Sequence, residues 1–137
     1  MKEDKIIWQY IFRIFNKRYW NGELKDIPVF KESLRDNKVG EFLFTEEGFN
    51  SILLASNEGL SNREMMGVLL HEMCHASALK QYGCNIEGHG LEWQNEMKKV
   101  GFSGLINELT DGIDFFSEED ENKILEEYLK MVNEYEL

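Results

Sequence analysis

The chain has few of the residues that separate domains. Among its 137 residues there is a single proline, Pro28, and no stretch rich in Pro, Gly or Ser that would form a linker. No internal repeat is present, which argues against a solenoid or a propeller. We therefore expect one domain over residues 1–137, with a core at about 5–102 and an acidic helical tail at 103–137.

Cysteine and positive charge are also scarce. Cys74 and Cys84 are the two cysteines and no signal-peptide pattern is present, which indicates reduced thiols rather than a disulfide. Lys and Arg number 15 against 26 Asp and Glu, so the net charge is -11. Such a charge repels phosphate backbones and anionic membrane surfaces, and it therefore disfavours DNA binding. Because no apolar run is long enough to span a bilayer, we expect a cytoplasmic protein without membrane contact.

Hydrophobic periodicity divides the chain into elements of different type. Apolar residues at helical spacing over 4–20 predict an N-terminal helix, which Asn21-Gly22 ends. Three short extended runs follow without intervening helices, at 27–30, 39–45 and 51–55. They predict a small three-stranded antiparallel sheet, formed as a meander.

Helical patterns return after the predicted strands. A capping box at Ser61 and Glu64 begins a long apolar helix that runs to about Tyr82. Further helices are predicted over 90–100 and from Ser117 onward, where acidic residues suit a helix N-terminus. The predicted fold class is therefore α+β, and the order along the sequence is an N-terminal helix, then the sheet, then the later helices.

The most informative motif is His71-Glu72-Met73-Cys74-His75, an H-E-x-x-H pattern inside the long predicted helix. Residues four apart lie on one helical face, so both imidazoles can reach the same cation. Glu72 is turned about 100° around the helix axis, where its carboxylate can take a proton from a water molecule on the metal. The pattern predicts a catalytic zinc ion (Zn2+) bound by His71 and His75, with Glu72 as general base.

A third ligand is needed to complete such a site. The third histidine of the chain, His89, lies just before the next predicted helix, and a catalytic zinc site is commonly completed from such a position. The neighbouring Glu87 and Glu92 are alternatives, either as ligands or as acceptors that orient an imidazole. Cys74 and Cys84 are potential thiolate ligands, although burial as a small hydrophobe is the commoner role of a residue like Cys74.

Further segments extend the pattern beyond the metal motif. Ala76 follows the motif directly, and Gly88-His89-Gly90-Leu91-Glu92-Trp93 is followed by Met97 and Gly101. Upstream are the helix exit at 15–24 and the strand Ile52-Leu53-Leu54. Together these segments, over roughly residues 10–102, resemble the SprT-like zinc metallopeptidases, the family of SprT- and Spartan-type protease domains.

The resemblance implies a fold, an activity and a set of site residues. The fold would be zincin-like, and the activity would be hydrolysis of peptide bonds in a protein or peptide substrate. His71, His75 and His89 would be the zinc ligands and Glu72 the general base. In a fold of this kind, the edge strand before the metal helix, here about 50–56, would bind an extended substrate by strand addition.

Several points stay open at the level of sequence. Tyr82, Tyr128 and Arg63 are candidates for stabilising the oxyanion, and no spacing argument selects one of them. Many relatives carry a Cys-rich zinc ribbon or a DNA-binding appendage, whereas residues 103–137 are an acidic helical tail, which adds to the expectation against DNA binding. Two alternative functions are a zinc-stabilised interaction module without catalysis and a regulatory protease of a single partner protein.

Overall fold

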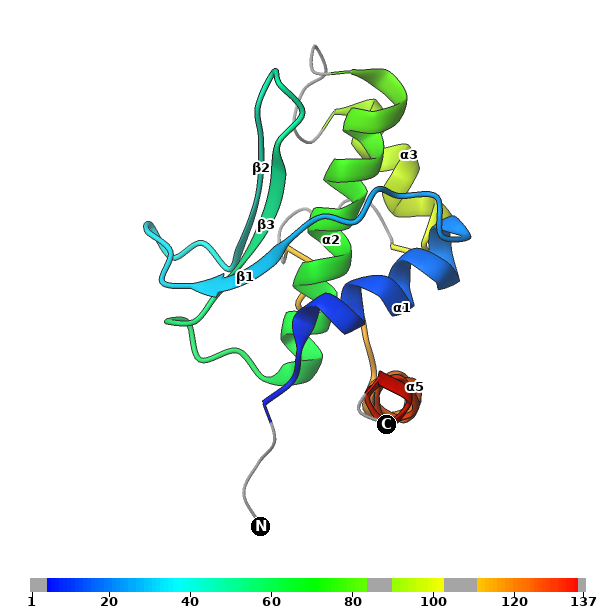
Figure 1. Cartoon of the computed structure of the whole chain (residues 1–137). Helices are drawn as coiled ribbons and strands as arrows, with labels where there is room; N and C mark the ends of the chain where they lie inside the picture. The colour runs from blue at the N-terminus through cyan, green and yellow to red at the C-terminus, as the bar shows by residue number, and fades with distance from the viewer. Residues whose placement is uncertain (1–4, 84–89, 103–110, 136–137) are drawn as a thin grey trace.

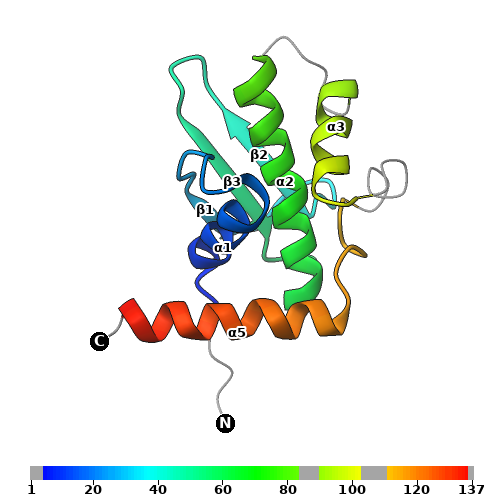
Figure 2. The ribbon, with the colours of Figure 1, turned by 90° about the vertical axis from the view of Figure 1, so that its right-hand side faces the viewer.

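The sequence folds into four helices and one three-stranded sheet in residues 5–83, 90–102 and 111–135, the ranges that the computed structural model describes. Their order is α1 (Trp8–Trp20), β1 (Val29–Glu32), β2 (Gly40–Phe44), β3 (Asn50–Ala55), α2 (Asn62–Tyr82), α3 (Leu91–Lys99) and α5 (Glu118–Tyr135). The sheet lies on one side of α2 and α3 on the other, and α1 packs against both α2 and α5 (Figures 1 and 2). The α+β class expected from the sequence is confirmed.

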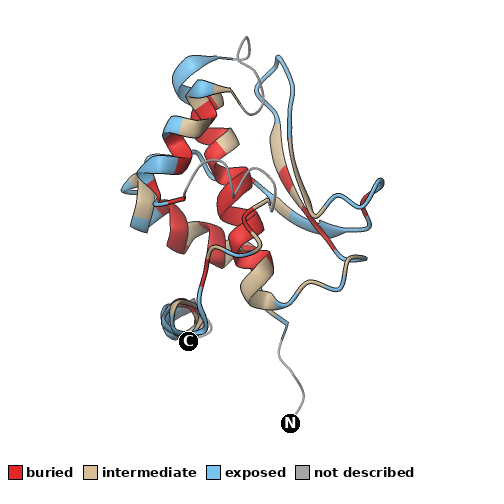
Figure 3. Ribbon diagram, turned by 180° about the vertical axis from the view of Figure 1, so that it is seen from behind, coloured by how far each residue is buried: buried red, intermediate tan, exposed pale blue. Residues whose placement is uncertain are grey.

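α2 is the central helix because most of its circumference is apolar. It begins with the predicted capping box, in which Ser61 Oγ accepts from the Glu64 N–H at 3.1 Å and the Glu64 carboxylate accepts from the Ser61 N–H at 2.8 Å. Gly83, with φ of 81°, ends the helix. Buried residues concentrate along α2 and on the neighbouring helices (Figure 3). Within the H-E-x-x-H motif, His71 and Glu72 are therefore buried, and His75 is half-buried.

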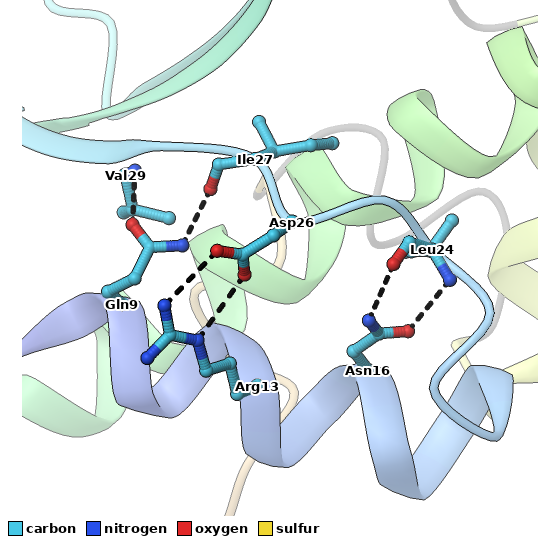
Figure 4. A network of polar contacts seen from close by, with 7 residues as sticks. All are labelled: Gln9, Arg13, Asn16, Leu24, Asp26, Ile27 and Val29. Carbon is cyan, nitrogen blue, oxygen red and sulfur yellow. Dashed lines mark hydrogen bonds and ion pairs between the residues drawn. The ribbon is translucent and has the colours of Figure 1, made fainter.

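Side chains of α1 fix the segment that leads to the sheet. The Asn16 amide donates to Leu24 O at 2.8 Å and accepts from Leu24 N at 3.0 Å. The Gln9 amide donates to Ile27 O at 2.8 Å and accepts from the N–H of Val29, the first residue of β1, at 2.9 Å (Figure 4). These reciprocal pairs hold residues 24–29 along α1 and so determine where β1 begins.

The sheet differs from the predicted antiparallel meander. Its order is β1-β3-β2, with β1 parallel to β3 and β2 antiparallel to β3. The Asn57 amide, just beyond β3, donates to Leu34 O at 3.0 Å and accepts from Leu34 N at 3.1 Å. Because α1 anchors the start of β1 and Asn57 anchors the segment after it, β1 pairs with β3 rather than with its sequence neighbour.

This strand order corrects the predicted position of the substrate-binding edge. β3, at the predicted 50–56, is the central strand, and its Ile52 and Leu54 are fully buried. The edge strands are β1 and β2, and β2 is the one that packs against α2. A strand with a neighbour on each side has no free hydrogen-bonding edge, so an added strand can pair with β2 but not with β3.

A buried carboxylate joins three helices. Glu96 of α3 is fully buried; it accepts from Ser77 Oγ of α2 at 2.5 Å and from Trp20 Nε1 of α1 at 3.5 Å. Lys99 forms an ion pair with its other oxygen at 3.0 Å. Buried charge is tolerated when it is paired and hydrogen-bonded, as it is here. The network fixes α3, and with it the residues of α3 that face α2.

α5 closes the end of the molecule at which α2 begins (Figure 2). It packs on α1 through Tyr128, whose hydroxyl accepts from the Ile7 N–H at 2.9 Å, and through an Arg18–Glu127 ion pair. Ahead of it, the ring of Phe116 stacks on Phe15 at 5.5 Å. In the ranges that the structure describes, no helix is long and apolar enough to cross a membrane.

The segment before α5 touches α2 at a point where both backbones carry glycine. A Cβ built on Gly67 would lie 1.9 Å from Gly112 O, and one built on Gly112 would lie 2.4 Å from Gly67 O. Gly112 also has φ of 88°, a conformation that favours glycine. The contact therefore requires the absence of a side chain on both residues.

We expect Gly67→Ala to destabilise the protein, although alanine in a helix interior normally stabilises it by about 1 kcal/mol relative to glycine. The added methyl group has to displace backbone, and overpacking of this kind costs about 1–3 kcal/mol. Urea denaturation measures the free energy of unfolding, with Asn133→Ala on the exposed part of α5 as the control for helix propensity. A Gly67→Ala variant as stable as the wild type would show that the contact is dispensable.

Candidate functional site

Two imidazoles and a carboxylate of α2 form the base of a cleft. The rings of His71 and His75 lie 5.1 Å apart, centroid to centroid, as expected for residues four apart on one helical face. The side chain of Glu72 between them is 5% exposed and that of His71 only 1%. The cleft has a volume of about 330 Å³ and is lined by Lys38, Val39, Gly40, Glu41, Phe42, Phe44, His71, Glu72, His75 and Asp111. The structure thus brings three of the four predicted site residues into one cavity.

Trp93 of α3 packs against both imidazoles. Its ring stacks on that of His75 at 5.2 Å with an interplanar angle of 18°, and it meets the ring of His71 at 5.1 Å and 61°. Trp93 is fully buried, so the indole cannot move away without opening the core. Each imidazole packs against Trp93 and against the other imidazole. These contacts restrict the rotation of the rings and so fix the direction in which they present their nitrogen atoms.

The edge strand β2 approaches α2 closely because it begins with glycine. A Cβ on Gly40 would lie 2.5 Å from Val68 Cγ1 and 3.1 Å from a carboxylate oxygen of Glu72. Any other residue at this position would push the strand away from the helix. Gly40 therefore determines how close β2 comes to α2, and so sets the width of the cleft above Glu72.

Asp111 enters the cleft from a distant part of the sequence. Its Oδ1 lies 3.8 Å from Nε2 of His71, and its backbone has φ of 54°. The adjacent Gly112 is the residue that contacts Gly67, one turn before His71 on α2. The close glycine contact therefore holds a carboxylate of the predicted tail beside a predicted metal ligand.

The environment of Glu72 favours its protonated form. Burial, together with the nearby negative charges of Asp111 and Glu41, raises the pKa of Glu72 to about 8. Lys38 opposes this shift but does not overcome it. An ionised Glu72 is costly in this cavity unless a positive charge lies beside it. The cleft is therefore electrostatically suited to a bound cation.

The remaining candidates from the sequence fall into two groups. His89, Glu87 and Cys84 lie outside the described residues. Of the others, Cys74 is fully buried and burial raises its thiol pKa well above the usual value, so it is not poised as a thiolate ligand. Tyr82, Tyr128, Arg63 and Glu92 do not line the cleft. In the part of the chain that is described, no three His, Cys, Asp or Glu side chains form a group that could hold a metal ion.

The fold and the cleft define an α+β protein whose central helix presents an H-E-x-x-H motif to an open cavity beside an edge strand. Residues 8–112 match the family model of the SprT-like family, and the chain belongs to this family. The family is associated with metallopeptidase-like proteins. A comparison of the sequence with curated proteins gives no significant match.

Sequence reasoning missed the residues that form the other side of the cleft. Gly40, Phe42 and Phe44 were assigned only to a strand, and Asp111 to a tail beyond the core. An isolated glycine inside an apolar helix, as at Gly67, is the one local signal of a close backbone contact. It does not reveal which segment makes the contact, so the position of Asp111 could not be derived from it.

The raised pKa of Glu72 predicts an unusual pH dependence for the metal-free protein. Between the ordinary pKa of 4.5 and about 8, the folded state holds a proton that the unfolded state has released. This contribution to the free energy of unfolding therefore falls as the pH rises through that window, by at most about 1.4 kcal/mol per pH unit. Glu72→Gln lacks the titration, so we expect its stability relative to the wild type to increase from pH 5 to pH 8.

Urea denaturation in the presence of a chelator measures this difference at each pH. The comparison is between two proteins at the same pH, so the other titrating groups largely cancel. Parallel stability curves for wild type and Glu72→Gln would contradict the burial of an ionisable Glu72 in the cleft.

Proposed function

We propose that this chain is a zinc-dependent peptidase with a zincin-like fold, and that the cleft beside α2 is its active site. One observation carries the proposal: two facing imidazoles and a buried carboxylate line the same open cavity. The donor set fits zinc, because neutral imidazole is a preferred ligand of this ion. The raised pKa of Glu72 supports the same conclusion, since a divalent cation would balance the carboxylate.

His71, His75 and His89 would hold the ion. The first two lie on one face of α2 and line the cleft. His89 is proposed as the third ligand on the basis of its place between α2 and α3 in the sequence. The stacked Trp93 keeps the ring of His75 in position. When bound, zinc supplies an activated water molecule and polarises the carbonyl group of the peptide.

Glu72 is proposed as the general base. Its carboxylate takes a proton from the attacking water and delivers it to the amine that leaves. A group that performs both transfers works best when its pKa is close to the working pH, and burial moves Glu72 in that direction. The open cleft also argues against a purely structural zinc site, because structural sites are closed by four protein ligands.

β2 is proposed to bind the substrate. It is the edge strand that lines the cleft, directly above Glu72. An extended polypeptide can pair with the free edge of β2 through backbone hydrogen bonds. Such pairing places a peptide bond of the substrate over the imidazoles and does not depend on a particular side chain. The proposed substrate is therefore a protein or peptide in extended conformation.

We expect Glu72→Gln to retain zinc and to lose cleavage by roughly 100-fold or more, the usual contribution of a general base. Glutamine has nearly the same shape but cannot accept the proton. The measurement is zinc content by mass spectrometry together with casein cleavage. Glu126→Gln, on an exposed part of α5, is the matched control and should leave cleavage unchanged. Undiminished cleavage by Glu72→Gln would refute the role of Glu72; zinc without cleavage in the wild type would favour the interaction module or a single-partner protease.

The third ligand is tested by three parallel variants. His89→Ala should lower the zinc content as strongly as His75→Ala does, because a site with two protein ligands holds zinc weakly. Glu87→Ala and Glu92→Ala should retain zinc. Zinc affinity is measured by competition with a chromophoric chelator in the absence of substrate. Loss of zinc in a glutamate variant but not in His89→Ala would assign the third position to that carboxylate.

A further inference from the structure

Two aromatic side chains of the edge strand face the proposed active site. Side chains alternate along a strand, so Gly40, Phe42 and Phe44 share one face of β2. Gly40 meets Val68 and Glu72 of α2, which identifies this face as the one turned toward the cleft. Both phenylalanines line the cleft, and their rings lie 5.7 Å apart with an interplanar angle of 25°. They form a continuous aromatic surface beside His75 and Glu72, which we call the aromatic wall.

Packing against the core involves only one of the two residues of the aromatic wall. Phe42 lies opposite the fully buried Ile52 and packs partly against the core. Phe44 lies opposite Asn50, does not belong to the core, and is 47% exposed. Phe44 also lines the cleft, so its exposed ring is turned toward the space that a bound peptide would occupy. Packing alone therefore does not explain Phe44.

An added strand would bring its own side chains to the aromatic wall. In a strand paired with β2, every second side chain points to the face shared by Phe42 and Phe44. Side chains directly opposite one another across two strands are about 4.5–5.5 Å apart at Cβ, so they are in contact. Aromatic and large aliphatic groups gain most from such a contact.

Negative charge in the lining of the cleft disfavours acidic side chains of a bound peptide. Among the described residues, the lining contains the carboxylates of Glu41, Glu72 and Asp111 and a single cation, Lys38, whose ammonium group lies 3.6 Å from the Glu41 carboxylate. The chain as a whole carries a net charge of -11. An acidic substrate side chain next to the aromatic wall would lose hydration without gaining a counter-ion.

We propose that the aromatic wall of Phe42 and Phe44 selects extended peptides with a large apolar side chain next to the bond to be cleaved, and rejects peptides with an acidic side chain there. The selection rests on the proposed function of the cleft as a peptide-binding site. It concerns recognition by β2 and is separate from the chemistry of Glu72, so the two can be tested apart.

The experiment uses the full zinc-loaded chain and three fluorescein-labelled ten-residue peptides. The peptides are identical except for a central Phe, Ala or Glu in an alanine and lysine background. Binding is measured by fluorescence anisotropy with Glu72→Gln, which retains the peptide, and cleavage by mass spectrometry with the wild type. We expect the Phe peptide to bind roughly tenfold or more tightly than the Ala peptide, and the Glu peptide to bind most weakly.

Phe44→Ala in the Glu72→Gln background should reduce the Phe-to-Ala preference to roughly twofold or less, and Phe44→Leu should restore most of it. Phe30→Ala is the matched control, because Phe30 of β1 is 48% exposed on the opposite face of the sheet and does not line the cleft. It should leave the preference unchanged. Phe44 is half exposed, so its replacement is not expected to prevent folding; circular dichroism verifies this for each variant.

Each outcome decides between the two proposals. Cleavage by the wild type without an apolar preference, or a preference that survives Phe44→Ala, would overturn the role of the aromatic wall and leave the peptidase intact. Selective binding of the Phe peptide without cleavage would support the wall and count against hydrolysis. No binding of any peptide at millimolar concentration, together with no cleavage, would overturn both.

Discussion

Close backbone contact at glycine positions is the constraint on which the cleft depends. Gly67 and Gly112 touch through their backbones, and Gly40 lies against Val68 and Glu72. All of these contacts fall on one stretch of α2, so β2 and the segment at 111–113 approach the same part of the helix from different directions. Their approach removes water from Glu72, and the loss of hydration is the main cause of its raised pKa. The electrostatics of the site thus follow from the absence of three side chains.

The helices could be predicted from the sequence because their signals are local. Ser61 and Glu64 begin α2 as expected, and Asn21, with φ of 56°, ends α1 at the predicted place. The arrangement of His71, Glu72 and His75 was also predictable, since helix geometry alone determines it. The predicted strands overlap the observed ones, with β1 displaced toward Glu32.

The pairing of the strands was not predictable, because it depends on contacts between residues far apart in the sequence. Gln9 and Asn57 place β1 beside β3, and no local sequence pattern identifies either residue as an anchor of the strand. For the same reason β3 was predicted to be an edge strand, whereas it is the central strand of the sheet. Asp111 could not be foreseen either, because its position follows from the contact of Gly112 with a residue 45 positions earlier.

The order β1-β3-β2 also determines how the sheet can open. Among the described strands, β2 is paired with β3 alone, whereas β3 is held on both sides and fully buried at Ile52 and Leu54. Separation of β2 therefore breaks one ladder of hydrogen bonds and leaves the parallel pair of β1 and β3 in place. Such a local opening requires less free energy than global unfolding. In the cleft, β2 can thus move while α2 stays fixed. The fold therefore combines imidazoles held rigidly on a helix with a strand beside them that can change its position.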